Sequence, residues 1–188
     1  MKYKLLFSIL LSISACFAQK QEIPAKIITI TNDTIVANIQ VDTNLFYDDI
    51  MYFGRLSKGV KYFDSANKKI KLPANQIKRM EFKDLKRKPR IFINDGNILK
   101  ELVYQNIVKC LVTYTANSSQ GTDNSSIDFY DENNEKVKSP PFTTSTYTLK
   151  KLVKQDPELL KLIDSSNLHF YELVKLVLKK YEDKYLVK

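Results

Sequence analysis

Residues 91–98 read Ile-Phe-Ile-Asn-Asp-Gly-Asn-Ile, an apolar run that leads directly into turn-forming residues. Asn, Asp and Gly tolerate the left-handed backbone that a tight hairpin turn requires, so this stretch predicts two antiparallel strands. Residues 98–104 and 107–114 have the composition of further strands, and Gln105-Asn106 separates them. The centre of the chain is therefore predicted to fold as an antiparallel meander.

The same alternation of strand and turn extends toward the N-terminus. Residues 26–41 have the pattern of a hairpin around Thr31-Asn32-Asp33, because apolar residues alternate with polar ones on both sides. A second hairpin is expected over 60–72 with its turn at 64–67, and 77–82 is another extended run. Short strands separated by turns about every eight to twelve residues indicate an antiparallel sheet, roll or barrel.

The pattern changes toward the C-terminus. Residues 115–126 are polar and lack periodicity, which predicts a solvated loop. A further turn is expected at 131–134, between short extended runs. Ser139-Pro140-Pro141 breaks the chain, and we place there the boundary between a β-rich domain (19–138) and a helical segment (139–188).

The helical segment contains start signals and an apolar stripe. Thr143 to Thr146 supply hydroxyl groups that can cap a first helix, and Asp156-Pro157 pairs a capping residue with proline at the first helical position. The last helix has one broad apolar stripe, made of Phe170, Leu173, Val174, Val177, Leu178, Tyr181 and Tyr185. The predicted fold class is α+β, an antiparallel β-rich body followed by C-terminal helices packed on it.

The N-terminus has the features of a signal peptide over residues 1–18. Lys2 and Lys4 give it a positive start, an uncharged apolar stretch follows, and Ala18 precedes the expected cleavage before Gln19. The apolar stretch is shorter than the roughly 20 residues that span a bilayer. We expect a periplasmic or secreted product whose mature chain has no transmembrane span.

A second interpretation of the leader keeps the protein on a membrane. Ile13-Ser14-Ala15-Cys16 resembles a bacterial lipobox, in which Cys16 becomes the lipidated first residue. The product would then be an outer-membrane lipoprotein. Either way Cys110 is the one cysteine left for the folded body, so its stability must come from its core and not from a disulfide.

The layout resembles that of exported proteins of unassigned function from Bacteroidetes-type bacteria. The residues that carry the resemblance are Phe17-Ala18-Gln19, the run 28–35, the segments 69–72 and 77–82, and Asp156 to Leu159. In those proteins an extended xDTIxGxI hairpin follows a leader ending in Phe-Ala-Gln. Here Ala37 stands where that pattern has glycine. The resemblance implies export and a strand layout, and it implies no site residues.

Composition and motifs argue against several function classes. The chain is 44% hydrophobic, which is too apolar for intrinsic disorder, and its formal charge of +9 favours anionic partners. The four glycines form no phosphate-binding motif, so no nucleotide or other cofactor is expected. Export also argues against nucleic acid as a partner.

Single residues offer weak catalytic candidates. His169 is the only histidine and is expected near the start of the last helix, where it has no evident triad or zinc partners. Cys110 alternates with Val108 and Val112, an apolar setting that raises a thiol pKa and indicates a buried small residue.

An acidic cluster could ligate calcium. It consists of Asp128, Asp131, Glu132 and Glu135. Its spacing does not match an EF-hand loop, and Lys136 and Lys138 oppose it, so an acidic hairpin tip is the favoured interpretation and no metal is expected.

The most concentrated feature is a basic run, made of Lys78, Arg79, Lys83, Lys86, Arg87, Lys88 and Arg90. A polyanion site is predicted here from five of them: Lys83, Lys86, Arg87, Lys88 and Arg90. The alternative is a solvated turn between two strands, with lysines protecting a sheet edge.

Three functions remain open from the sequence. The first is a non-catalytic binding or scaffolding module of the cell envelope, whose partner is an envelope protein or an anionic glycan or lipid surface. The second is an exported hydrolase that uses a pair of carboxylates. The third is electrostatic attachment to anionic envelope polymers through the basic run.

The leader generates the first prediction. Protein recovered from the cell envelope should begin at Gln19, because export removes the signal. Intact mass and N-terminal sequencing would measure this, and a lipid-modified Cys16 would identify the lipoprotein alternative. Envelope material that still carries Met1 would contradict both.

Overall fold

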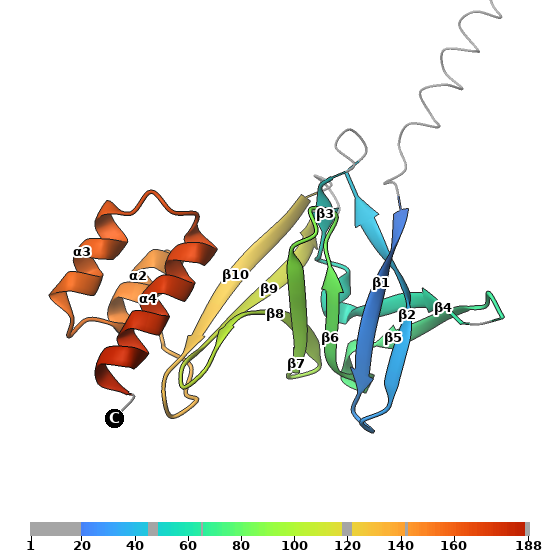
Figure 1. The fold of residues 1–188 in the computed structure, drawn as a ribbon, viewed down its shortest axis with the longest axis horizontal. Helices are drawn as coiled ribbons and strands as arrows, with labels where there is room; N and C mark the ends of the chain where they lie inside the picture. Colours follow the sequence, from blue (N-terminus) through green and yellow to red (C-terminus); the bar gives the residue numbers. More distant parts are fainter. Residues whose placement is uncertain (1–19, 45–48, 65, 118–121, 142, 187–188) are drawn as a thin grey trace, which may run out of the picture. The chain divides into compact units, whose positions relative to one another are not determined.

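The structure, a computed structural model, describes most of the chain. The described residues are 20–44, 49–64, 66–117, 122–141 and 143–186. The predicted leader, with Cys16, Ala18 and Gln19, lies outside them. The described residues form an antiparallel β-sheet followed by three helices (Figure 1), which confirms the predicted α+β class.

Ten strands are described. In chain order they are β1 (Lys20–Thr29), β2 (Thr34–Thr43), β3 (Met51–Tyr52), β4 (Gly59–Phe63), β5 (Lys69–Pro73), β6 (Ile77–Lys83), β7 (Pro89–Asp95), β8 (Ile98–Gln105), β9 (Lys109–Asn117) and β10 (Thr122–Tyr130). Their order in the sheet is β10-β9-β8-β7-β6-β1-β2-β4-β5, and β3 pairs with β2. Two 3₁₀ helices, η1 (Leu56–Lys58) and η2 (Ala74–Gln76), connect strands.

Alternation along β1 shows why these residues form strands. Ile23, Ala25 and Ile27 are buried, while Pro24 and Lys26 between them are exposed. Ile23 lies directly opposite Ile39 of β2 in the antiparallel register, so apolar residues of both strands face the same core. This confirms the hairpin predicted around 31–33.

Four connecting turns share one geometry. In each, the N–H of the first residue donates to the carbonyl of the fifth, and the N–H of the fourth donates back to the carbonyl of the first. The fourth residue has a positive φ, as in a three-residue hairpin loop that ends in a left-handed residue. The four turns span 29–33, 64–68, 84–88 and 131–135, and their fourth residues are Asn32, Asn67, Arg87 and Asn134. The turns expected at 64–67 and 131–134 are thus confirmed.

The loop predicted over 115–126 is wrong for 115–117 and 122–126, which belong to strands, while 118–121 lie outside the described residues. β9 continues to Asn117, and β10 begins at Thr122. β10 ends the strand order, and its first residues are mostly exposed, so polar side chains are tolerated there. Because neither face of this stretch needs apolar residues, the sequence has no alternation that would reveal a strand.

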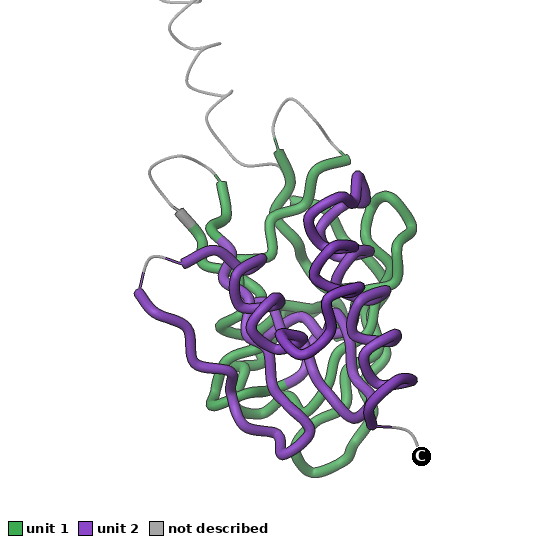
Figure 2. Tube along the Cα trace, turned by 90° about the vertical axis from the view of Figure 1, so that its left-hand side faces the viewer, with its two compact units in different colours: residues 1–90, 94–99, 114–124 green, residues 91–93, 100–113, 125–188 purple. Residues whose placement is uncertain are grey.

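The chain divides into two compact units, coloured separately in Figure 2. Unit 1 takes residues up to 90 together with 94–99 and 114–124, and unit 2 takes 91–93, 100–113 and 125 onward. The division falls within β7 to β10, so each of these strands contributes to both units. The expected boundary at Ser139-Pro140-Pro141 lies inside unit 2, whose helices share a core with strand residues.

Unit 2 is built around three helices, α2 (Ser145–Leu152), α3 (Pro157–Ser165) and α4 (Phe170–Tyr185). Thr144 caps α2 and Asp156 caps α3, as their sequence signals predicted. The predicted stripe of α4 is confirmed: Leu173, Val174, Val177, Leu178 and Tyr181 are buried, and Phe170 and Tyr185 pack beside them. Phe129 of β10 and Val108 belong to the same core.

The buried stripe gives the second prediction. Val177 is completely buried, so Val177→Asp places an unpaired charge in the core and should lower the free energy of unfolding by about 3 kcal/mol or more. Val36→Asp is the matched control, because Val36 is 78% exposed; its loss should stay within about 1 kcal/mol. Urea denaturation measures both values. Equal losses in the free energy of unfolding would mean that the apolar stripe of α4 is not packed in the core.

Candidate functional site

The predicted polyanion site lies in the hairpin that joins β6 to β7, and residues 83–90 are called the basic turn below. Asp84 opens the turn and is buried. Its N–H donates to the Lys88 carbonyl at 2.9 Å, and its carbonyl accepts from the Arg87 N–H at 2.8 Å. Its Oδ1 also accepts from the Lys88 N–H at 2.8 Å. These bonds define the backbone of the turn.

Two of the five predicted site residues are paired with carboxylates. Arg90 Nε and Nη2 each lie 2.9 Å from Asp84 Oδ2, and the guanidinium stands 5.2 Å above the centre of the Phe53 ring. Lys86 Nζ lies 2.9 Å from Asp49 Oδ2 in an exposed pair. Arg90 therefore stabilises the turn and is not available to a ligand, while Lys86 is partly neutralised.

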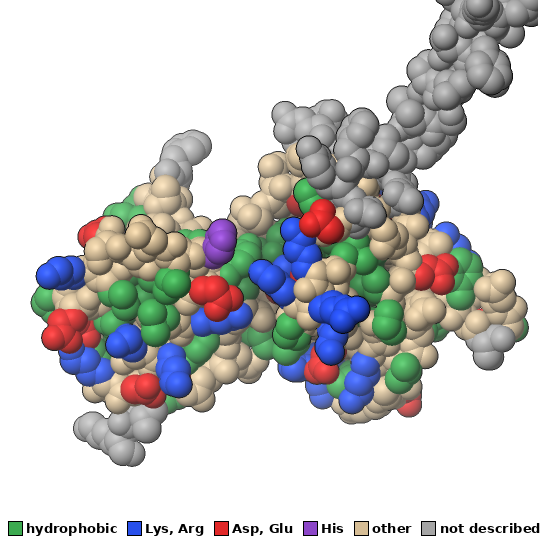
Figure 3. Space-filling view, turned by 45° about the horizontal axis from the view of Figure 1, so that its top comes forward, with side chains coloured by type: hydrophobic (Ala, Val, Ile, Leu, Met, Phe, Trp, Pro, Cys, Tyr) green, Lys and Arg blue, Asp and Glu red, His purple; other side chains and the backbone are tan. Residues whose placement is uncertain are grey.

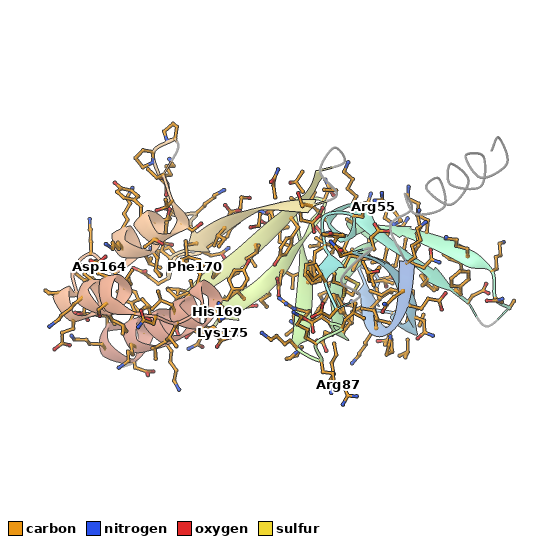
Figure 4. The ribbon with its side chains drawn as sticks, turned by 90° about the horizontal axis from the view of Figure 1, so that it is seen from above. Arg55, Arg87, Asp164, His169, Phe170 and Lys175 are labelled. Atoms are coloured by element: carbon orange, nitrogen blue, oxygen red, sulfur yellow. The ribbon has the colours of Figure 1, made fainter. Side chains whose placement is uncertain are left out.

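The other three are unpaired. Lys83, Arg87 and Lys88 are exposed, and none of them forms an ion pair with any described residue. Figure 4 shows the Arg87 side chain extending away from the ribbon. Three free cations thus lie within six residues of sequence, on a turn whose backbone is held by Asp84.

Lys78 and Arg79, at the start of the run, are engaged elsewhere. Lys78 Nζ donates to Asn32 Oδ1 at 2.8 Å, and Arg79 Nε lies 2.6 Å from Glu81 Oε1. β6 and β7 also lie inside the strand order, so their lysines protect no edge. The terminal strand β5 has that protection instead, from Lys69 and Lys71.

The acidic cluster is dispersed by the fold. Asp128 Oδ2 lies 3.0 Å from Lys100 Nζ, and its Oδ1 lies 2.7 Å from Lys136 Nζ. Burial alone would raise the pKa of Asp128, but the hydrogen bonds from Lys136 and Lys100 outweigh it and hold that pKa below its usual value. Asp131 accepts backbone N–H groups within its own turn. Within the described part of the chain, no three His, Cys, Asp or Glu side chains converge as metal ligands would.

Glu182 is a buried carboxylate that the sequence did not reveal. It lies on α4 with 1% of its surface exposed. It accepts from Tyr104 Oη at 2.6 Å, from Asn106 Nδ2 at 2.8 Å and from the Val108 N–H at 2.6 Å. Burial, followed by the hydrogen bond to Glu182, raises the pKa of Tyr104 above its ordinary range. This network ties α4 to the β8–β9 connection and is structural.

Asp156 holds the ends of two helices. Its Oδ1 accepts from the N–H groups of Glu158 and Leu159 at 2.9 and 3.1 Å, which caps α3. Its Oδ2 lies 2.9 Å from Lys184 Nζ and accepts from Tyr185 Oη at 3.1 Å. The hydrogen bond from Lys184 is the main cause that lowers the pKa of Asp156.

Neither Cys110 nor His169 is arranged for catalysis. Cys110 is buried, and burial, with smaller effects from Asp128 and Glu101, raises its pKa to about 12, so the thiol stays protonated and unreactive. His169 is exposed at the N-cap of α4, where its side chain makes no capping hydrogen bond. Cys110 is thus the buried small residue that was predicted, and His169 lies at the start of the last helix, where it was expected.

Asp123, in unit 1, is a carboxylate bonded to backbone N–H groups. Asp123 Oδ2 accepts from the backbone N–H groups of Phe53 and Gly54, the second at 2.8 Å. Burial is the main cause that raises the pKa of Asp123, and the nearby charge of Asp42 adds to it. Asp42 itself lies 3.0 Å from Arg55 Nη1. A Cβ on Gly54 would stand 2.3 Å from the Ala116 nitrogen, so this segment packs directly on β9.

Comparisons with protein-family models, curated proteins and solved structures gave no match to this chain. No helix of the described residues combines the length and apolar character that a bilayer span requires.

The lowered pKa of Asp156 gives the third prediction. A carboxyl whose pKa is lower in the folded than in the unfolded protein adds stability that is present above the unfolded pKa, near 3.9, and is lost as the pH falls through the folded value. Asp156→Asn should therefore reduce stability at pH 7 and show a smaller further loss between about pH 5 and pH 2.

Urea midpoints measured across this pH range test that expectation. Asp183→Asn is the control, because Asp183 is exposed and forms no ion pair among the described residues; its substitution should cost less stability at pH 7 than Asp156→Asn. An Asp156→Asn curve with the original slope would mean that this carboxyl does not contribute to acid unfolding.

Proposed function

We propose that this chain is an exported, non-catalytic binding protein of the cell envelope, and that its basic turn attaches it to an anionic envelope polymer or surface. The observation that supports this most is the set of three unpaired cations, Lys83, Arg87 and Lys88, on a turn whose backbone is already fixed. A fixed backbone reduces the entropy that the turn must lose when a ligand binds.

The pattern of ion pairs in the turn supports a binding role. Asp84 neutralises Arg90 inside the protein, and Asp49 neutralises Lys86, so the remaining positive charge faces solvent. Counterions around a polyanion are released when such cations bind it, and this release favours association at low salt. The overall surplus of basic residues acts in the same direction over longer distances.

The predicted leader supports the location. Cleavage before Gln19 would release the protein into the periplasm or the medium, and lipidation of Cys16 would hold it at the outer membrane. Both products meet anionic lipids and glycans. With an anchor at the N-terminus, even weak binding by the basic turn would gain from the high local concentration of such groups.

A carboxylate hydrolase is the second candidate, favoured by Asp123 and Asp42. A carboxyl with a raised pKa near a second carboxyl group is the arrangement that acid–base hydrolysis uses. Against it, Asp123 Oδ2 already accepts two backbone N–H groups, which is a structural role. The hydrolase function would be established instead if Asp123→Asn abolished hydrolysis of an envelope glycan and Asp128→Asn did not.

The binding proposal gives the fourth prediction. A triple variant should weaken binding to anionic vesicles or acidic glycans if it replaces Lys83, Arg87 and Lys88 by Gln. The slope of log affinity against log salt concentration should fall by about 2. The fold should survive, since the three side chains are exposed and such substitutions usually cost within about 0.5 kcal/mol each. Co-sedimentation or interferometry over a salt series measures both quantities.

The control separates a local site from diffuse attraction. Basic side chains occur at many places on the face displayed in Figure 3, beside acidic and apolar ones. Lys154, Lys179 and Lys180 changed to Gln remove the same charge from exposed positions of unit 2. If both triple variants lose the same affinity, net charge alone attracts the polymer. No binding by the original protein at low salt would remove the proposal.

A further inference from the structure

The basic turn departs from its three counterparts at the residue that must be left-handed. At the fourth position of the other turns the chain has Asn32, Asn67 and Asn134, with φ of 65°, 57° and 58°. Asn accepts this backbone conformation far more readily than other residues with a side chain. The basic turn has Arg87 at the same position, with φ of 60°. Asn would give the turn a more stable backbone at this position as well. We therefore look for a role of the arginine outside the turn.

A second difference concerns the aspartate that opens the turn. In the two other turns that begin with Asp, its Oδ1 accepts two N–H groups: those of Ala66 and Lys68, or those of Asn133 and Glu135. Asp84 Oδ1 accepts only the second of these backbone groups, from Lys88, and its Oδ2 binds Arg90.

The position that corresponds to Ala66 and Asn133 is Lys86. Its N–H has no hydrogen-bond partner within the described part of the chain. This backbone donor belongs to an exposed residue, and Arg87, which is also exposed, follows it in the chain. Backbone N–H groups next to a left-handed residue can bind anions. Those of Arg87 and Lys88 are bonded to Asp84, so the Lys86 N–H is the one that remains.

We propose that the basic turn binds a phosphate monoester group of its polyanion through the Arg87 guanidinium and the Lys86 N–H, with Lys83 and Lys88 flanking it. This inference rests on the proposed function and specifies its ligand. A guanidinium fork occupies two oxygens of an oxyanion. A phosphate monoester keeps a third terminal oxygen for the backbone N–H, whereas a carboxylate has only two. Its charge of −1.5 to −2 near pH 7 also suits several cations better than a single carboxylate does.

Two sources could supply this group: a lipid headgroup and a phosphorylated glycan. Vesicles that contain phosphatidic acid represent the first, and dextran phosphate represents the second. Phosphatidylglycerol vesicles and polygalacturonate, matched in charge density, present phosphodiesters and carboxylates instead. Phosphatidic acid vesicles should bind the protein more tightly than phosphatidylglycerol vesicles, and dextran phosphate should bind it more tightly than polygalacturonate. Of the two monoester probes, the one that binds more tightly identifies the source.

The test uses the mature chain and the substitution Arg87→Asn. Because Asn suits the left-handed backbone, the variant should melt about 2 °C higher than the original protein. It should nevertheless bind the monoester probe at least about tenfold more weakly, since a charge-assisted contact is lost. A residue that served only the turn would not give a gain in stability together with a loss of binding.

Two matched variants control for charge. Arg87→Lys keeps the charge and the backbone conformation but removes the fork, so affinity should fall several-fold without a rise in melting temperature. Lys83→Gln removes one charge beside the site and should weaken binding by about threefold or less.

The inference is overturned if Arg87→Asn and Lys83→Gln weaken binding equally, if Arg87→Asn melts lower, or if the diester and carboxylate probes bind as tightly as the monoesters. In each of these cases a polyanion still binds, so the broader proposed function survives. Failure of the original protein to bind any probe at low salt would overturn both.

Discussion

A short antiparallel hairpin loop must contain residues with left-handed backbone, and the sheet depends on how this chain meets that requirement. Among the described residues, positive φ occurs at Asn32, Gly59, Asn67, Arg87, Gly96, Asn97 and Asn134. Asn and Gly adopt this region at low cost, so most of the turns agree with their local sequence. Each turn then sets the register of the strands that it joins, and through them which residues face the core. Arg87 is the exception, and it is also one of the three unpaired cations of the basic turn.

Buried carboxylates organise unit 2, where no disulfide is available. Asp156 joins the start of α3 to the end of α4, and Glu182 joins α4 to the β8–β9 connection. Each of these side chains has several donors, so the cost of burying its charge is offset by hydrogen bonds. The apolar core supplies the attraction between helices and strands, while these two groups specify how α4 is oriented within the unit. The hydrogen bonds of both groups serve the fold, so the exposed cations are the better functional candidates.

Local signals in the sequence predicted much of the fold, because turns and caps depend on neighbouring residues. The turn at 64–67, the Asp156-Pro157 helix start and the apolar stripe of α4 were all recognisable and are confirmed. The strand at Thr122 was missed, because an exposed strand at the end of the sheet has no apolar alternation. Glu182 was missed for another reason: its partners lie more than 70 residues earlier in the chain, so its pattern is that of a surface glutamate. The candidate site was found as a concentration of charge, but the pairing of Lys86 with the distant Asp49 was not visible in the sequence.

The close packing of Gly54 also bears on how this protein's lineage could be traced. Any side chain at position 54 would have to displace the backbone of Ala116, and no rotation of a side chain relieves that collision. Turn positions such as Asn32 are different, since Gly or Asp can replace Asn there with little loss. Over long divergence the turn residues and exposed lysines should therefore drift, while glycine at 54 and its hydrogen-bond acceptor Asp123 should change only together. That pair is a more durable marker of common ancestry than the four repeated turns.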